Sequence, residues 1–329
     1  MPLLPPHSLG FDPAPATCLD ALSDLERGLN AVVPRKRRGR NLLIGTWNIR
    51  HFGRVQKAWQ SKPRVSPKRN LQDVCCIATV ISRFDVVALV EVKRDLEALR
   101  LLLRILGPDW AFIVSDVTEG DRGNSERLGY VFNLRRVRPS GLVGELVVPD
   151  EELRDAAAIM ERQFARTPYT VSFRVSEQGF TLVTLHVYYG ERDEPELRTP
   201  ELRRISAWLR DHAEDPDEFN RNLIALGDFN IDRRDDDNWH AFVGDDGPLP
   251  PFELLDLPRT LGETATDHSH YDQIAWFSKG RRAALTLKYV TAGNFVWDDH
   301  LLKGVPVSEK EARISDHYPL WAEFETDGG

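Results

Sequence analysis

The stretch that most constrains the fold is residues 223–230, with the sequence Leu-Ile-Ala-Leu-Gly-Asp-Phe-Asn. Its apolar run predicts a buried strand that ends at Gly227, directly before Asp228 and Asn230. A strand that ends in a carboxylate and an amide places two short polar groups at the edge of a sheet, where α/β folds tend to put their chemistry. Gly-Asp and Asn are also common turn residues, so these eight residues by themselves favour a turn and an active site equally.

The composition indicates an ordinary globular protein of one large domain or two modest ones, with 329 residues, 41% hydrophobic and 29% charged. No apolar stretch reaches the roughly 18 residues that a membrane span needs. The proline-broken N-terminus lacks the basic start of a secretory signal. Cys18, Cys75 and Cys76 are odd in number and two are adjacent, which disfavours both a disulfide framework and a zinc site. We therefore expect reduced thiols, a cytoplasmic location and no stable membrane association.

The charge is unevenly distributed along a chain whose net charge is −8. Residues 34–70 contain no Asp or Glu but many Lys and Arg, whereas residues 191–256 are rich in acids. Such asymmetry can mark a surface that binds a polyanion. A solvated segment explains the basic run 34–40 equally well when that run is taken alone.

The hydrophobic periodicity predicts strands and helices that alternate along the chain. Strands are expected at 41–48, 84–92, 110–116, 128–137, 168–175, 179–189, 222–228, 270–277, 284–290 and 317–325. Helices are expected at 18–31, 70–83, 95–106, 150–165, 200–213 and 236–243. Long loops are expected at 50–69, 117–126, 231–268 and 291–314. Asn70 is a candidate N-cap, and several strand pairs look like hairpins, so we expect a mixed sheet rather than a parallel one.

Polar side chains accumulate where the predicted strands end. They are Asn48, Glu91, His186, Asp228, Asn230, Asp272, Asp316 and His317. Carboxylate and amide oxygens suit Mg²⁺ or Mn²⁺, and two histidines can supply the base and the acid that cleavage of a phosphodiester requires. Each residue alone has an ordinary structural explanation, but together they favour a catalytic site without a serine or cysteine nucleophile.

Eight short motifs carry a resemblance to a known family. TWNIRHFG, VEVKRD, NSERLGYVF, FARTP, TLHVYYG, GDFN, YDQI and SDHYPL occur in the order seen in the endonuclease/exonuclease/phosphatase superfamily, and the chain is most similar to its deoxyribonuclease I branch. The resemblance implies an α/β (α+β) fold, namely a four-layer α/β/β/α sandwich of two packed mixed β-sheets flanked by helices. It covers residues 42–326, the expected catalytic domain. Residues 1–41 are left as an N-terminal extension with a proline-rich start, a short helix and a basic linker.

The resemblance also implies a metal site and a water-orienting pair. Glu91 matches the acidic residue that holds the divalent metal, and Asn48 and Asp316 fall beside the same ion or its waters. Asp228 and Asn230 match the pair that orients the attacking water and contacts the scissile phosphate.

Two histidine–carboxylate pairs are implied in the same way. His317 matches the general base, oriented by Asp272, and His186 matches the general acid, with Glu126 as its partner. A carboxylate beside an imidazole fixes its tautomer and raises its basicity. The positions that match cations near the DNA backbone or minor groove are Arg50, Lys93 and Arg166.

The expected function is therefore a Mg²⁺-dependent phosphodiesterase, a deoxyribonuclease I-like endonuclease that attacks DNA with a water in line. Mn²⁺ could replace Mg²⁺, and Ca²⁺ could serve as a structural or auxiliary ion. DNA is the expected partner and a monomer the expected state. The alternatives are a sphingomyelinase-like or other small-phosphoester hydrolase, and a non-catalytic nucleic-acid-binding module. The groove-inserting tyrosine of the deoxyribonuclease branch would fall near Asn124, where this chain has none, but the basic loop 50–69 favours nucleic acid over lipid.

Overall fold

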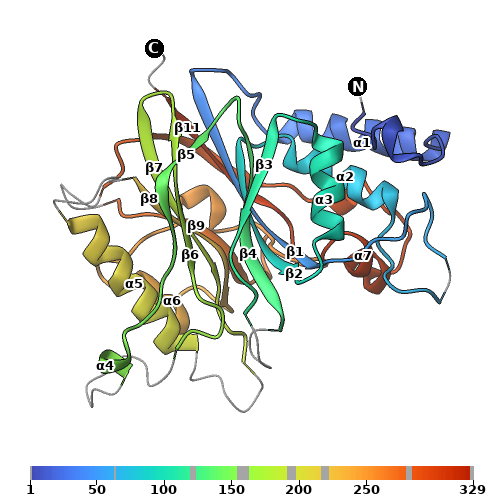
Figure 1. The fold of residues 1–329 in the computed structure, drawn as a ribbon. Helices are drawn as coiled ribbons and strands as arrows, with labels where there is room; N and C mark the ends of the chain where they lie inside the picture. Colours follow the sequence, from blue (N-terminus) through green and yellow to red (C-terminus); the bar gives the residue numbers. More distant parts are fainter. Residues whose placement is uncertain are drawn as a thin grey trace.

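The structure is a computed structural model, and it describes residues 2–62, 64–118, 124–153, 163–190, 198–215, 222–278 and 284–326. Two mixed β-sheets pack face to face, and helices cover the outer side of each sheet (Figure 1). The expected four-layer α/β/β/α sandwich is confirmed.

The first sheet has six strands in the order β10-β11-β1-β2-β4-β3. Their bounds are β10 (Lys288–Asn294), β11 (Leu320–Glu325), β1 (Asn41–Phe52), β2 (Val86–Lys93), β4 (Glu126–Asn133) and β3 (Trp110–Val114). β1 and β2 are parallel, and the other neighbours are antiparallel. β2 shows the period of two that a strand buried on both faces requires, because Val86 and Ala88 point between the sheets while Val87 and Leu89 point to the helices.

The second sheet has five strands in the order β5-β6-β7-β8-β9. Their bounds are β5 (Arg138–Glu145), β6 (Tyr169–Val175), β7 (Gln178–His186), β8 (Leu223–Ile231) and β9 (His270–Ala275). β7 and β8 are parallel, and their register pairs His186 with Asp228. Between the two sheets, the Tyr130 hydroxyl of β4 donates to the carbonyls of Tyr169 and Leu182 in the facing sheet, at 2.8 and 2.9 Å.

The helices form the two outer layers. α1 (Ala16–Val32), α2 (Leu71–Ile81) and α3 (Glu97–Leu106) lie on the first sheet, while α5 (Arg198–Glu214) and α6 (Asp237–Val243) lie on the second (Figure 1). The remaining short elements are α4 (Asp150–Leu153), α7 (Val307–Arg313) and the 3₁₀ turns η1 (His7–Leu9), η3 (Phe252–Leu254) and η4 (Trp297–Asp299). No helix in the described part of the chain is long and apolar enough to cross a membrane. Asn70 is the N-cap of α2, as predicted, in a reciprocal capping box with Asp73.

The N-terminal segment folds onto the sandwich. Leu22 and Leu25 of α1 are fully buried in the same apolar cluster as α2 and α3. Part of the basic run 34–40 is structural as well, because Lys36 Nζ donates to the carbonyl of Phe84 at 2.6 Å. Burial lowers the pKa of Lys36 to about 8. This end of the molecule, where β1 begins, is opposite to the end described below as the candidate site.

Residues 223–230 differ from the prediction, because their strand does not end at Gly227. β8 continues to Ile231. Gly227 has φ +132°, and a Cβ atom there would lie 2.1 Å from the Leu185 carbonyl oxygen of β7. Glycine is therefore needed here because the backbones of β7 and β8 approach closely, and not because the chain turns. The irregularity comes later, at Asn230, whose φ is 51° and where the ladder with β9 shifts register.

Several other boundaries also differ from the prediction. β1 runs on to Phe52, into the expected loop 50–69. The edge strand β5 was not predicted, since its side chains are mostly exposed and lack alternation. The expected excursion 291–314 contains the end of β10 and all of α7. Of the expected helix 150–165, residues 150–153 are helical, residues 163–165 are not, and residues 154–162 lie outside the described part.

Candidate active site

Three strands are irregular at the same end of the sandwich, the lower end in Figure 1. The ladders shift register between Asn48 and Phe52 in β1, between Leu89 and Val92 in β2, and between Asp228 and Ile231 in β8. Within these shifts, Glu91 has φ 62° and Asn230 has φ 51°, in the left-handed region that side chains other than glycine seldom adopt. Bulges of this kind re-aim side chains next to functional sites, and here they turn polar groups from both sheets toward one another.

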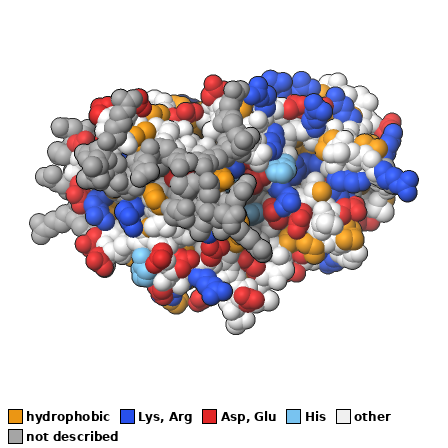
Figure 2. Space-filling model, turned by 90° about the horizontal axis from the view of Figure 1, so that it is seen from below, with side chains coloured by type: hydrophobic (Ala, Val, Ile, Leu, Met, Phe, Trp, Pro, Cys, Tyr) orange, Lys and Arg blue, Asp and Glu red, His pale blue; other side chains and the backbone are white. Residues whose placement is uncertain are grey.

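A cleft of about 380 Å³ opens between these strand ends. It is lined by Asn48, Glu91, Asn124, Glu126, Arg166, His186, Tyr188, Tyr189, Gly190, Asp228, Asn230, Tyr271 and His317. Figure 2 views the molecule from this end, and Lys and Arg side chains gather along one side of the face. The structure therefore brings most of the predicted site residues to one cleft.

Asn48 joins the two sheets at the floor of the cleft. Its Nδ2 donates to Glu91 Oε1 of the first sheet at 3.1 Å and to Asp228 Oδ2 of the second sheet at 3.0 Å. The other oxygen of Asp228 accepts the backbone N–H of Asn230 at 3.0 Å, and Asn230 Nδ2 donates to the Val187 carbonyl at 2.6 Å. These bonds fix the Asp228 carboxylate in one orientation.

His317 is held by a buried carboxylate. Its Nδ1 lies 2.5 Å from Asp272 Oδ2, and Asp272 is fully buried. Because a carboxylate only accepts, Nδ1 carries the proton and Nε2 is left facing Asp228 Oδ2 at 4.0 Å. Burial opposes a positive imidazole, but the charges of Asp272 and Asp228 outweigh it and raise the pKa of His317 to about 9.

His186 lies on the other side of Asp228. Its Nε2 is 3.8 Å from Asp228 Oδ2, and its Nδ1 is 3.3 Å from Glu126 Oε2. Burial would raise the pKa of Glu126, but His186, Arg166 and Lys93 outweigh it and lower this pKa to about 2. The two imidazoles thus approach the same oxygen of Asp228, each backed by its own carboxylate.

The three predicted substrate-binding cations are all paired with acids of the site. Lys93 Nζ lies 3.0 Å from Glu126 Oε1, and Arg166 Nε lies 2.8 Å from Glu126 Oε2. Arg50 makes a short contact with Asp316. In this arrangement Lys93 and Arg166 keep the Glu126 carboxylate ionised. Both cations are engaged with Glu126 rather than free in the cleft.

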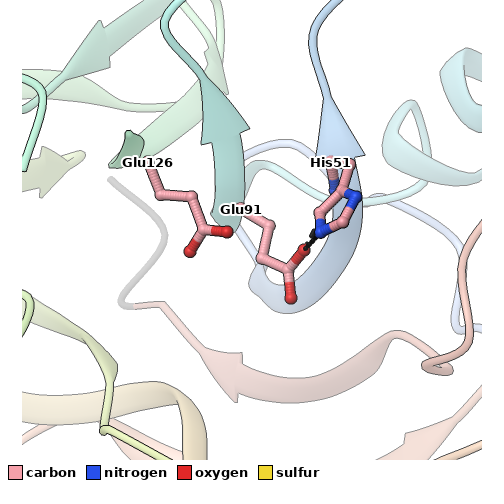
Figure 3. A group of neighbouring side chains, drawn as sticks. All are labelled: His51, Glu91 and Glu126. Carbon is pink, nitrogen blue, oxygen red and sulfur yellow. Dashed lines mark hydrogen bonds and ion pairs between the residues drawn. The ribbon is translucent and has the colours of Figure 1, made fainter. Parts of the chain in front are cut away.

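Glu91 has the surroundings that a divalent cation requires. It is partly exposed to the cleft, and no Lys or Arg among the described residues forms an ion pair with it. His51 approaches it closely, with the backbone N–H donating to Glu91 Oε2 at 3.0 Å and the ring Nε2 at 3.5 Å from the same atom (Figure 3). One ligand atom each of His51, Glu91 and Glu126 can be chosen so that all lie within 4.8 Å of one another. Glu126 already carries two cations, and Asp316 faces Arg50, so Glu91 is the carboxylate that fits an ion best.

Some residues of the cleft were not predicted from the sequence. His51 stands in the motif TWNIRHFG, three residues after Asn48, where the left-handed backbone at the end of β1 turns it back to Glu91. Tyr189 and Tyr271 also line the cleft. The available signal was their position in the motifs, since Tyr189 stands three residues after the TLHVYYG histidine and Tyr271 stands directly before the YDQI carboxylate.

A sandwich with polar groups of these kinds at the ends of its parallel strands is that of a hydrolase acting on phosphoesters. The sequence model of the endonuclease/exonuclease/phosphatase family matches residues 45–317, and the chain belongs to this family. No curated protein matches the chain.

Solved structures of differently named proteins share this fold. A humanized D. rerio TDP2 is 18% identical, with 87% of this chain and 99% of that chain covered and a TM-score of 0.54. A mannosyl-6-phosphatase of Bacteroides thetaiotaomicron is 15% identical, with 86% and 99% covered and a TM-score of 0.56. The human nocturnin catalytic domain with bound sulfate is 14% identical, with 88% and 96% covered and a TM-score of 0.55. At these identities the likeness shows the shared fold, and it does not single out the deoxyribonuclease I branch.

Proposed function

We propose that the chain is a divalent-metal-dependent phosphodiesterase that cleaves DNA internally by in-line attack of water. The observation that supports this most directly is the position of Asp228 between two imidazoles, at 3.8 Å from His186 Nε2 and 4.0 Å from His317 Nε2. In-line displacement needs a proton acceptor on the side of the attacking water and a proton donor on the side of the departing oxygen.

The residues divide these tasks according to their surroundings. His317, oriented by Asp272, takes the proton of the attacking water, which Asp228 and Asn230 orient. His186 gives a proton to the departing oxygen, and Glu126, whose Oε2 lies 3.3 Å from His186 Nδ1, orients the imidazole. A cation held by Glu91 with Asn48 would stabilise charge on the phosphate oxygens and, by its positive charge, disfavour protonation of His317.

DNA is the proposed substrate because Lys and Arg side chains gather along one side of the face that carries the cleft (Figure 2), and because one fold relative is complexed with DNA. Lys62, Arg64 and Lys68, in the connection between β1 and α2, form no ion pair with another described residue. A neighbouring cation, Arg69, is instead buried and donates to the carbonyls of Ile49, Arg50, Arg313 and Ile314, which ties this connection to the domain. A D. rerio TDP2 with this fold, 16% identical, is complexed with a single-stranded DNA product.

The test is cutting of supercoiled plasmid and of circular single-stranded DNA in the presence of Mg²⁺ by four proteins. We expect nicking by the wild type that stops with chelator, and its loss in His186→Ala and His317→Ala. The control is His240→Ala, an exposed histidine on α6 outside the cleft, which should cut normally. Intact plasmid and intact single-stranded DNA together with hydrolysis of sphingomyelin or of a small phosphomonoester would refute the DNA proposal and favour the corresponding alternative.

A further inference from the structure

One wall of the cleft is aromatic. Tyr189 follows the catalytic-motif residue His186 by three positions, and its side chain is 54% exposed. Tyr271 precedes Asp272, and its ring meets that of Tyr189 edge to face, with centroids 6.0 Å apart and an interplanar angle of 84°. The Tyr271 ring is also 6.3 Å from the ring of His317, so this wall continues into the reactive centre.

The exposed ring is held in place by its neighbours. The Arg198 guanidinium lies 5.0 Å from the Tyr189 ring centroid, and it is itself fixed by a bond to the Asn230 carbonyl and an ion pair with Asp232, both 2.9 Å. The Tyr271 hydroxyl donates to the same Asp232 at 3.3 Å. A large ring that is fixed by two partners yet half open to a cleft is preorganised to receive a flat group, because little side-chain freedom is lost on contact.

We infer that Tyr189, supported by Tyr271 and Arg198, is a stacking subsite for the nucleobase beside the scissile phosphate, and that the preferred substrate is single-stranded DNA. This inference rests on the proposed function. In a duplex both faces of each base are covered by neighbouring bases, so the subsite can be filled only by a base that is unstacked on one side. A cation and two hydroxyl-bearing rings also suit a π-system better than an acyl chain.

The first experiment measures binding and turnover of matched oligonucleotides by Tyr189 variants. With single-stranded DNA we expect Tyr189→Ala to raise KM about tenfold or more with little change in kcat, since stacking on one aromatic side chain is worth about that much. Tyr189→Trp should restore KM and Tyr189→Leu should not. The control is Phe252→Ala, which removes an aromatic side chain that is 76% exposed outside the cleft.

A second experiment locates the stacked base. A single-stranded oligonucleotide that carries 2-aminopurine is bound to His317→Ala, which should not cut it, in the presence of Mg²⁺. We expect quenching of the fluorescence at one position, and its loss when Tyr189→Ala is added. An abasic residue at that position should abolish the difference in affinity between the proteins with and without Tyr189.

The outcomes separate the inference from the proposed function. Cleavage of duplex and single-stranded DNA with equal efficiency, or a Tyr189→Leu protein as active as wild type, would overturn the subsite while leaving the nuclease in place. A wild-type protein that neither binds nor cuts any DNA would overturn both. Thermal unfolding of each variant confirms that changes in KM arise in a folded protein.

Discussion

At the scale of single residues, the two histidine–carboxylate pairs differ in their electrostatics. Glu126 is shared by His186 and by two further cations, so its ionised form is strongly favoured. Asp272 is fully buried, and its side chain makes one described contact with an ionisable group, His317. The Glu126 carboxylate is therefore held ionised by several neighbours, whereas the Asp272 carboxylate has His317 as its one described ionisable partner, so the two histidines have different electrostatic surroundings.

The low pKa of Glu126 predicts a pH-dependent contribution to stability. With a pKa of about 2 in the folded protein against 4.5 ordinarily, its charge stabilises the fold above pH 4.5, and this stabilisation is lost as the pH falls toward 2. Glu126→Gln should be less stable than wild type at pH 7, by up to about 3 kcal/mol. Denaturant unfolding at pH 3–7 should show this difference shrinking below pH 4.5. A constant difference would contradict the prediction, and Glu151→Gln, at an exposed carboxylate, serves as the control.

The contact between Asp272 and His317 predicts a loss of rate without a loss of binding. In Asp272→Asn the amide can present its NH₂ to Nδ1, which selects the tautomer with the proton on Nε2 and removes the base. We expect kcat for DNA to fall by roughly 10²- to 10⁴-fold at nearly unchanged KM. Asp267→Asn, an exposed acid nearby in the chain, should leave both constants unchanged. An equal rise in KM would instead indicate that Asp272 acts in substrate binding.

At the scale of elements, the site depends on interruptions in otherwise regular strands. β1, β2 and β8 each shift register within the residues that carry Asn48, Glu91 and Asp228. The regular part of each strand is buried in the sandwich and fixes its position, while the bulge sets the direction of the functional side chain. The backbone strain at Glu91 and Asn230 is thus supported by the packing of whole strands.

Gly227 tests this dependence on strand packing. Alanine at this position would meet the Leu185 carbonyl oxygen at 2.1 Å in addition to an unfavourable φ of +132°. We expect Gly227→Ala to destabilise the protein by about 3 kcal/mol or more, because the backbones of β7 and β8 must separate. Gly262→Ala has φ +87° with nothing within 4 Å of its Cβ atom, so it should cost only about 1 kcal/mol. Thermal unfolding of the two variants separates the cost of the steric clash from the cost of the unfavourable φ. Equal losses of stability in the two variants would contradict the prediction.

The elements with the strongest local sequence patterns are those that the sequence predicted correctly. The runs around Val87 and Ala225 are apolar on both faces and were predicted as buried strands, and Asn70 was recognised as a cap from its side-chain chemistry. β5 and α7 were missed because their residues are mostly exposed and their pairing depends on partners far away in sequence. Among the site residues, the polar strand ends could be listed from the sequence. The pairing of Lys93 and Arg166 with Glu126, and the return of His51 to Glu91, required the folded backbone.

At the scale of the whole molecule, the basic stretch near the N-terminus is divided between two opposite ends. Its first part lies where β1 begins, and there Arg38 lines a hollow with Arg138 and Arg174. Its second part, the connection after β1, lies at the cleft end, where Lys and Arg side chains gather (Figure 2). The described residues of 34–70 therefore do not form one continuous basic surface, and the second part is the one that lies toward the cleft end.

This division predicts which cations affect DNA binding. Replacing Lys62, Arg64 and Lys68 together by Gln should weaken binding and reduce the slope of log K against log salt by up to about 3, because each phosphate contact releases roughly one counterion. Replacing Arg38, Arg138 and Arg174 removes the same charge at the far end and should leave the slope unchanged. Affinity measured from 50 to 200 mM salt distinguishes the two triple variants. Equal effects would show that only net charge matters.

The hydrogen bonds of Asn48 to both Glu91 and Asp228 have a consequence for the chain before it is fully folded. The two acceptors belong to different sheets. His186 is the last residue of β7 in the second sheet, and His317 lies just before β11 of the first sheet. Neither half of the sandwich contains a complete set of reactive groups. We therefore expect no phosphoesterase activity from a chain that is still being synthesised, or from one whose two sheets have separated. The activity should appear only once the two sheets have packed together.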